Sequence, residues 1–319
     1  MMMNSTKNLY KFSPGTVIIG KWNKNKYKII RELGEGATGT VYLVESHNRY
    51  AALKMSRDSM AITSEVNVLK VFTKVQDSLL GPSLIEMDDW EINKESLPFY
   101  VMEYVKGKEL LAFMSTKDFS WSGVLILQLL NDLHQMHEAG WIFGDLKPEN
   151  LIVTDPPYKI RCIDVGGTTM RGRALKEYTE FFDRGYWGLG TRKAEPSYDL
   201  FAVAMIMINI CYPKRFPKKE GGLVQLRKII QQTIKLKPFE NILIHALTGK
   251  YATASEMRID LLQLLTKLDK HPSPMIQQGH PKSRVLLKKK KKESHFFETI
   301  VITTIISFIY VIYIVGQLL

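Results

Sequence analysis

The pattern of apolar and polar positions divides the chain into a strand-rich first part and a helical second part. Alternation over residues 27–33 and β-branched residues over 40–44 predict two strands, and apolar residues at helical spacing over 62–72 predict the first helix. Further helices are predicted over residues 121–139, 199–210, 223–236, 238–248 and 254–268. The segment 199–210 is apolar nearly all round and too short to cross a bilayer, so we expect a buried helix. Strands followed by helices predict an α+β fold.

The end of the chain has a different pattern. Residues 269–281 contain three prolines and a glycine and are typical of a linker. From Thr299 to Leu319 no residue is charged. A helix of this length, at about 1.5 Å per residue, covers roughly the 30 Å core of a bilayer. We therefore predict a transmembrane helix over 295–319; the alternative, a helix of a soluble core, has nothing after it to pack on.

Charge strengthens this prediction. The 319-residue chain carries a net charge of +12, and residues 282–292 hold seven basic residues and no acidic one. By the positive-inside rule, this basic run places the preceding domain in the cytoplasm, with the C-terminus across the cell membrane. Lys288–Lys292 is expected to contact anionic lipid headgroups, at about 1 kcal/mol per residue. Nucleic-acid binding is the alternative, although no aromatic residues are interleaved for base stacking.

Composition sets the remaining limits. A hydrophobic content of 45% and a charged content of 24% are enough for one large domain or two lobes. The two cysteines, Cys162 and Cys211, lie in apolar runs, which indicates reduced core thiols rather than a disulfide framework.

The densest polar chemistry lies between residues 141 and 166. Asp145, Lys147, Asn150 and Asp164 stand around a turn that apolar strand-like residues flank. Carboxylate and amide oxygens hold hard cations, and an ammonium stabilises charge on a migrating phosphoryl group. This set of side chains therefore points to magnesium-assisted phosphoryl transfer.

The order of these residues resembles protein kinases. The run D-L-K-P-E-N from Asp145, followed by D-V-G from Asp164, is similar to the kinase catalytic loop and metal motif, and lysine two positions after the first Asp is the serine/threonine form. The resemblance implies that Asp145 accepts or orients the hydroxyl proton. It also implies that Asn150 and Asp164 hold Mg²⁺ or Mn²⁺, and that Lys147 neutralises charge.

Two motifs near the N-terminus extend the resemblance. Gly34, Gly36 and Gly39 bridge two predicted strands, as in the kinase glycine-rich loop, and their missing side chains let backbone amides approach phosphate oxygens; a plain glycine hairpin is the alternative. Lys54 lies inside an apolar strand, where it needs a partner. By resemblance it would bridge the ATP phosphates and Glu65, for which a surface position is the alternative.

The adenine site is implied only by the resemblance. Met102 would take the gatekeeper position, and the backbones of Glu103 and Val105 would read the adenine edge. The ring would lie between three apolar side chains, which could equally belong to an ordinary core: Val41, Ala52 and Ile152.

Residues of the second half extend the resemblance further. Thr191, after Gly190, resembles the threonine that touches the catalytic Asp and Lys, and Asp199 resembles the acid that accepts catalytic-loop amides. His134 and His137 are three apart on a predicted helix, but no third metal ligand is nearby. We expect these histidines to be solvated or hydrogen-bonded.

Two hypotheses follow from positions at which the chain departs from the kinase pattern. Gly144 stands where kinases place an arginine that meets a phosphorylated activation loop, so we predict that the catalytic loop does not depend on such a phosphate. Phe143 is large where His is usual and Val165 is small where Phe is usual. Because interiors are close-packed, volume lost at one position is expected to be regained at the other.

The whole pattern resembles the small Hanks-type serine/threonine kinases of spore-forming bacteria that carry a basic juxtamembrane segment and a C-terminal anchor. It implies a two-lobed protein kinase-like fold that uses ATP to phosphorylate Ser/Thr of protein substrates, itself included. The departures keep a membrane-anchored pseudokinase scaffold as an alternative function, beside the nucleic-acid binder. The predicted domains are an arm (1–22), an N-lobe (23–103), a C-lobe (104–268), a linker with the basic run (269–294) and the anchor (295–319).

Overall fold

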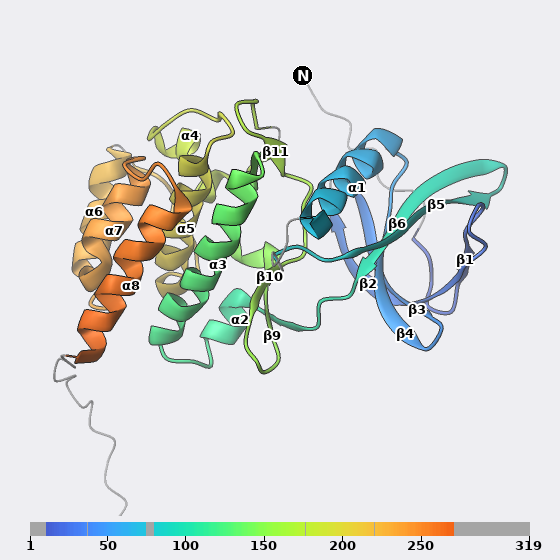
Figure 1. Ribbon diagram of the computed structural model, residues 1–319, viewed down its shortest axis with the longest axis horizontal. Coiled ribbons are helices and arrows are strands. Elements are labelled where there is room, and N and C mark those ends of the chain that lie inside the picture. The colour runs from blue at the N-terminus through green and yellow to red at the C-terminus, as the bar shows by residue number, and fades with distance from the viewer. Residues whose placement is uncertain (1–10, 37, 75–79, 176, 220, 271–319) are drawn as a thin grey trace, which may run out of the picture. The chain divides into compact units, whose positions relative to one another are not determined.

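The first part of the chain folds into one antiparallel sheet of six strands in the order β1-β2-β3-β4-β6-β5 (Figure 1). The computed structural model describes residues 11–36, 38–74, 80–175, 177–219 and 221–270. The strands are β1 Val17–Ile19, β2 Lys26–Gly36, β3 Gly39–Ser46, β4 Arg49–Met55, β5 Leu84–Ile92 and β6 Glu95–Glu103. Alternate residues of β2, such as Tyr27 and Ile29, enter the core, which is the half-buried pattern that alternation predicts.

Helix α1, Ser59–Lys74, packs against this sheet. Asp58 caps its start, because its carboxylate accepts the amides of Met60 and Ala61 at 2.9 and 3.0 Å. Ile62 and Val66 are buried on the face that meets β5 and β6. The helix thus begins only a few residues after β4, which explains the short interval between Lys54 and Glu65.

Helices dominate the second part of the described chain. They are α2 Leu110–Met114, α3 Ser120–Glu138, α4 Arg184–Trp187, α5 Pro196–Cys211, α6 Gly222–Gln232, α7 Glu240–Leu247 and α8 Ala254–Lys270. Short 3-10 turns are η1 Pro148–Asn150, η2 Glu180–Phe182 and η3 Lys237–Phe239. Helix α3 begins and ends one residue before the predicted 121–139, and Gly140 follows it with a φ of +85°, as expected after a helix end.

Helix α5 lies at the centre of the helical part. Its residues from Leu200 to Ile208 are at most 1% exposed, and α3, α7 and α8 pack around it. An apolar surface on every side is what a helix enclosed by other helices requires. The predicted buried helix is therefore present.

Strands of small sheets flank the turn that contains Asp145 and Asn150. β9 Leu151–Thr154 pairs with β10 Ile160–Cys162 and with β7 Gly107–Glu109. β8 Trp141–Ile142 pairs with β11 Thr169–Met170. The loop between β8 and β9 and the loop between β10 and β11 therefore both connect these small sheets, which brings residues 143–150 and 163–168 to one place.

A strand-rich lobe followed by a helical lobe confirms the predicted two-lobed kinase-like architecture. Both cysteines are free thiols, Cys162 buried and Cys211 half-buried. Among the helices that the structure describes, none is long and apolar enough to span a bilayer. The chain divides into a unit Met1–Pro272 and a unit Ser273–Leu319. The predicted anchor and the lysine run fall in the second unit, outside the described residues, so both stay predictions.

Candidate active site

A cleft of about 1090 Å³ collects almost every residue that the sequence singled out. Polar and apolar residues share its lining, as expected of a site for a nucleotide. The predicted site residues in its lining are Gly34, Gly36, Gly39, Val41, Ala52, Lys54, Met102, Glu103, Val105, Asp145, Lys147, Asn150, Ile152 and Asp164. Glu65 lies outside the lining and reaches the cleft through Lys54, and Thr191, which was predicted to touch the catalytic Asp and Lys, is also outside it.

Lys54 and Glu65 form a buried ion pair. The ammonium donates to Oε1 of Glu65 at 2.8 Å and lies 2.7 Å from Oε2, with side-chain exposures of 6% and 5%. The hydroxyl of Tyr100 also donates to Oε2 at 2.7 Å. Burial, together with the negative charge of Glu65, raises the pKa of Tyr100 well above its ordinary value. Tyr100 therefore stays a donor and fixes the carboxylate, a role that the apolar pattern of β6 concealed.

The glycine-rich turn joins β2 to β3. Side chains at Gly34 and Gly36 would meet open space, or nothing closer than 3.9 Å, so their absence leaves the cleft free. Gly39 differs, because it has a φ of +146° and a Cβ there would collide with the carbonyl of Met55. Its glycine is required by packing against the end of β4 as well as by access to a phosphate.

The end of the cleft that the resemblance assigns to adenine lies at the last residue of β6. The amide of Glu103 donates to Ser83 O at 2.9 Å. Its carboxylate accepts two hydrogen bonds from Arg161 of β10, at 3.0 and 2.8 Å, and Arg161 also donates to Gly81 O at 2.8 Å. The hydrogen bond from Arg161 is the main reason why the pKa of Glu103 lies below its ordinary value. The sequence assigned only the backbone of Glu103; this link between the end of β6 and β10 is an addition from the structure.

Hydrogen bonds to the buried helix α5 hold the catalytic loop, residues 143–150, in place. Asp199, fully buried in the first turn of α5, accepts the amides of Phe143 and Gly144 at 2.8 and 2.9 Å. His137 of α3 lies 2.9 Å from the same carboxylate and is only 3% exposed. His137 is thus hydrogen-bonded, as expected, and it helps to fix the loop.

Gly144 has a backbone that other residues rarely adopt. Its φ is +83°, and a Cβ there would lie 2.6 Å from Gly167 O and 2.8 Å from Leu175 Cδ2. An arginine at this position would therefore be strained and obstructed, whatever its partner.

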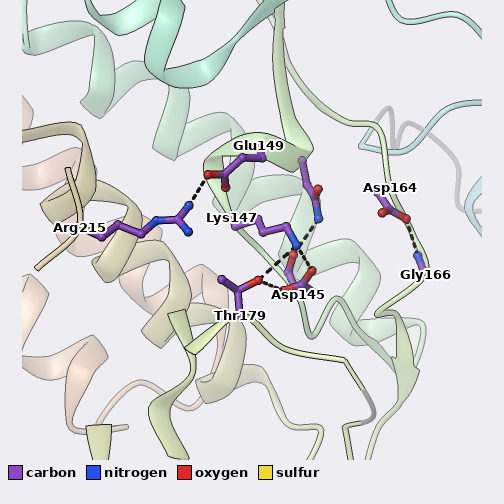
Figure 2. A network of polar contacts seen from close by, with 8 residues as sticks. Asp145, Lys147, Glu149, Asp164, Gly166, Thr179 and Arg215 are labelled. Atoms are coloured by element: carbon purple, nitrogen blue, oxygen red, sulfur yellow. Dashed lines mark hydrogen bonds and ion pairs between the residues drawn. The ribbon is translucent and has the colours of Figure 1, made fainter. Parts of the chain in front are cut away.

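Lys147 and Thr179 meet at the carboxylate of Asp145, as Figure 2 shows. The ammonium of Lys147 donates to Oδ2, and the hydroxyl of Thr179 donates to Oδ1 at 2.9 Å. Lys147 also lies 3.2 Å from the hydroxyl of Thr179. The prediction for Thr191 is wrong: Thr191 is exposed, and its carbonyl accepts from Arg184. The glycine before Thr191 suggested a motif, whereas no local pattern marks Thr179.

Two oxygen ligands for a cation face the same cleft. The Asn150 amide nitrogen donates to Asp145 O at 3.0 Å, and Asp164 Oδ1 accepts Gly166 N at 2.9 Å. This leaves the Asn150 carbonyl and the second oxygen of Asp164 for a metal. No cluster of three or more His, Cys, Asp or Glu suited to a metal occurs in the described part of the chain. One carboxylate and one amide fit Mg²⁺, which keeps several waters and takes further oxygens from substrate phosphates.

Glu177 of the activation segment (residues 164–195) also lines the cleft. Its pKa is raised, first by burial and then by the negative charges of Asp164 and Glu65. A cation near Asp164 would relieve this repulsion. Sequence reasoning did not single out Glu177.

Comparison with known proteins gives concordant results. The protein kinase domain family matches residues 27–279. The chain is 53% identical over 273 residues to serine/threonine-protein kinase YabT of Bacillus subtilis (strain 168), covering 85% of this chain and 81% of that protein. It is 22% identical over 273 residues to serine/threonine-protein kinase PrkC of the same organism, of which it covers 41%.

A solved structure supports the fold alone. The structure of vaccinia related kinase 3 superposes with a TM-score of 0.61 at 16% sequence identity, covering 83% of this chain and 94% of that one.

Proposed function

Because this chain belongs to the serine/threonine protein kinases, we propose that it transfers the γ-phosphate of ATP at this cleft, using Mg²⁺, while tethered to the cytoplasmic face of the cell membrane. One observation carries the assignment of the site. Asp145, Asn150, Asp164 and the Lys54–Glu65 pair open on a single cleft. A scaffold without activity would have no need to keep all of these groups together.

The substrate hydroxyl is handled by Asp145. Lys147 and Thr179 hold its carboxylate in one orientation, so it can accept or orient the proton of an incoming Ser or Thr hydroxyl. Lys147 then lies beside the transferred phosphoryl group and stabilises its charge. Preset hydrogen bonds of this kind need no rearrangement when the substrate arrives.

The phosphates are placed from the opposite side of the cleft. Lys54, fixed by Glu65, contacts phosphate oxygens, while the backbone at Gly34 and Gly36 covers them. Asn150 and Asp164 would hold Mg²⁺, which neutralises charge on the phosphates when bound. Val41, Ala52, Met102 and Ile152 enclose the adenine.

Activity without loop phosphorylation follows from how the activation segment is held. Backbone bonds join Leu175 N to Arg192 O at 2.9 Å and Ala194 N to Arg173 O at 2.8 Å. The guanidinium of Arg192 also stacks 4.0 Å over the ring of Tyr178. These contacts support a segment that is fixed without a phosphate, in agreement with the positive φ of Gly144, at which an arginine would be strained.

Phosphate transfer from labelled ATP to a protein substrate tests the site. We expect the full chain to be active and the Asp145→Ala variant to be inactive at equal concentration. Replacing Thr168 and Thr169 together with Ala should leave activity intact, because neither touches Asp145. An inactive double variant that is still folded would show that the loop needs a phosphate after all.

Membrane attachment needs a separate test. The uncharged segment 299–319 and the basic run before it support the proposal. The full chain should sediment with membranes and resist extraction by salt and alkali. Replacing Lys288–Lys292 with Ser should weaken its binding to anionic vesicles. Complete release of the full chain by salt would contradict the anchor.

A further inference from the structure

A basic loop borders the catalytic loop. Residues 212–219, the first eight of the ten positions between α5 and α6, contain Lys214, Arg215, Lys218 and Lys219, and the acidic Glu220 follows them. We call this segment the basic loop. Lys214 and Lys219 are exposed, and no side-chain partner of either occurs among the described residues. The ammonium of Lys218 donates to Tyr186 O at 2.7 Å, so its charge also stays uncompensated.

Arg215 of this loop is paired with Glu149 of the catalytic loop (Figure 2). Glu149 stands two residues after Lys147 and directly before Asn150. Its side chain is 50% exposed, and that of Arg215 is 32% exposed. The guanidinium also lies 4.8 Å over the ring of Phe182 and 5.9 Å from that of Phe181. Rings and carboxylate together hold the planar guanidinium in one place.

The basic loop is itself packed in position. The ring of Phe216 meets Phe181 at 5.1 Å and Trp187 at 6.0 Å, both edge to face. Phe181 and Trp187 are buried residues of the activation segment. The charges of the basic loop are therefore presented by a supported segment next to the active site.

A peptide substrate must pass this surface. Its hydroxyl has to reach Asp145, which lies four residues before Glu149 in the same loop. An extended peptide advances about 3.3 Å per residue, so residues one to four positions from the acceptor reach the surroundings of Glu149. A free carboxylate there would attract Arg or Lys. With Arg215 in place the pair is neutral, and the three lysines leave an excess of positive charge.

Acidic side chains elsewhere confine the attraction for acidic peptide residues to one side of the peptide. Glu109, Glu177 and Glu180 line the cleft, and Glu109 and Glu180 are exposed. None of them is part of the basic loop. The stretch of peptide that crosses the basic loop therefore meets mainly positive charge, whereas the stretch over the cleft meets these carboxylates beside Lys54 and Lys147.

We propose that Arg215 and the lysines of the basic loop make this kinase select protein segments with acidic residues beside the phospho-acceptor and reject arginine there. This deepens the proposed function, on which it rests, by giving the same active site a substrate class. A nucleic acid also carries negative charge, but the pairing of Arg215 with Glu149 of the catalytic loop favours a peptide that delivers a hydroxyl to Asp145.

Peptide phosphorylation by the full chain tests the proposal. The peptides contain one Ser in an alanine background, with Glu, Ala or Arg placed singly at each of the four positions on either side. At one or more positions on one side, we expect kcat/KM to be about fivefold higher for Glu than for Arg, the upper range for an exposed charge contact. Equal values at every position, or a preference for Arg on both sides, would overturn the proposal.

Variants then locate the cause. Arg215→Gln frees Glu149, so the Glu-to-Arg ratio should fall to about one or invert, and Glu149→Gln/Arg215→Gln should not invert. Lys214→Ala/Lys219→Ala should lower the ratio in a chain that keeps the Arg215 contacts, which decides the matter if Arg215→Gln fails to fold. The matched control Arg227→Ala/Lys228→Ala removes two exposed charges from α6 and should leave the ratio unchanged. An unchanged ratio in both Arg215→Gln and Lys214→Ala/Lys219→Ala would overturn the proposal.

Two further outcomes are distinguishable. If a DNA duplex inhibited phosphorylation of the all-alanine peptide by the wild type and not by Lys214→Ala/Lys219→Ala, the basic loop would be a nucleic-acid surface and the proposal would be wrong. If the full chain phosphorylated no peptide better than its Asp145→Ala variant, the proposed function would fail instead.

Discussion

The Lys54–Glu65 pair and the Lys147–Asp145 pair border the same cleft, but they differ in their access to water. The first has side-chain exposures of 6% and 5%, and the second of 24% and 11%. A buried pair is costly to break, because the remaining charge has no solvent, whereas a solvated pair separates at little cost. The first pair therefore supports the fold as well as the phosphates, and the second leaves its carboxylate accessible to a substrate.

The largest effect is expected for the more exposed pair, Lys147 with Asp145. Asp145→Asn keeps the shape of the side chain and removes the proton acceptor, so kcat should fall by about 10²–10⁴. The thermal midpoint should stay near that of the wild type, because Lys147 remains hydrated. Steady-state kinetics and calorimetry on the same preparation measure both. A variant within tenfold of the wild-type kcat would remove Asp145 from the chemistry.

The buried pair should behave in the opposite way. Glu65→Gln leaves the ammonium of Lys54 without a countercharge, and we expect the free energy of unfolding to fall by about 3–5 kcal/mol, with loss of activity. Urea unfolding measures the change. Glu91→Gln, which breaks the exposed pair with Lys21, is the control and should cost under about 1 kcal/mol. Equal losses of unfolding free energy in the two variants would show that burial does not set the cost of breaking an ion pair in this protein.

Packing under the catalytic loop comes next. Phe143 and Val165 are 1% and 2% exposed in the same apolar core. Val165→Phe adds volume to a filled site and should destabilise the protein by about 1–3 kcal/mol and lower kcat. The double variant Phe143→Leu/Val165→Phe should recover part of both. Unchanged kcat and stability in the single variant would show that the two positions do not compensate each other.

Two threonines, Thr179 and Thr191, were candidates for the contact with Asp145, and removal of each hydroxyl distinguishes them. Thr179→Val removes a hydrogen bond to a charged carboxylate, for which we expect about a tenfold loss of kcat. Thr191→Val should have no effect, because its hydroxyl lies away from the catalytic loop. The two variants assayed side by side check this. The reverse order of effects would restore the original assignment of Thr191.

The smallest effect is expected for the pair of Glu103 and Arg161. Because Arg161 lowers the pKa of Glu103 below its ordinary value of 4.5, the pair stabilises the fold above pH 4.5, and this stability is lost as pH falls through the lowered pKa. Glu103→Gln should therefore have a lower thermal midpoint than the wild type at pH 7, and the difference should vanish in acid. A difference that grew on acidification would contradict this sign.

Elements with a strong local constraint were predicted from the sequence. A lysine in the apolar strand Ala51–Met55 needs a partner, and the following helix offers only one acid at the right face, so the pairing of Lys54 with Glu65 is present as expected. The roles of these and the other site residues in catalysis stay predictions until the variants are assayed. The two lobes could be predicted because the apolar period changes from two to 3.6 between them, and the structure confirms them.

Contacts between distant segments left no local signal. Thr179 reaches Asp145 across 34 positions, and Arg161 reaches Glu103 across 58. Arg215 meets Glu149 across 66 positions, from a loop whose lysines and two prolines are typical of any solvated turn. Such partners depend on how the segments are folded over one another, and neither spacing nor periodicity specifies that.

The anchoring of the catalytic loop to Asp199 has a consequence for hydrogen exchange. The amides of Phe143 and Gly144 are bonded to a carboxylate in the enclosed first turn of α5, so solvent deuterium can reach them only when the surrounding helices separate. Their exchange rates should then report the global opening of the helical lobe. Assembly of the machinery at Asp145 and folding of that lobe would be a single cooperative event.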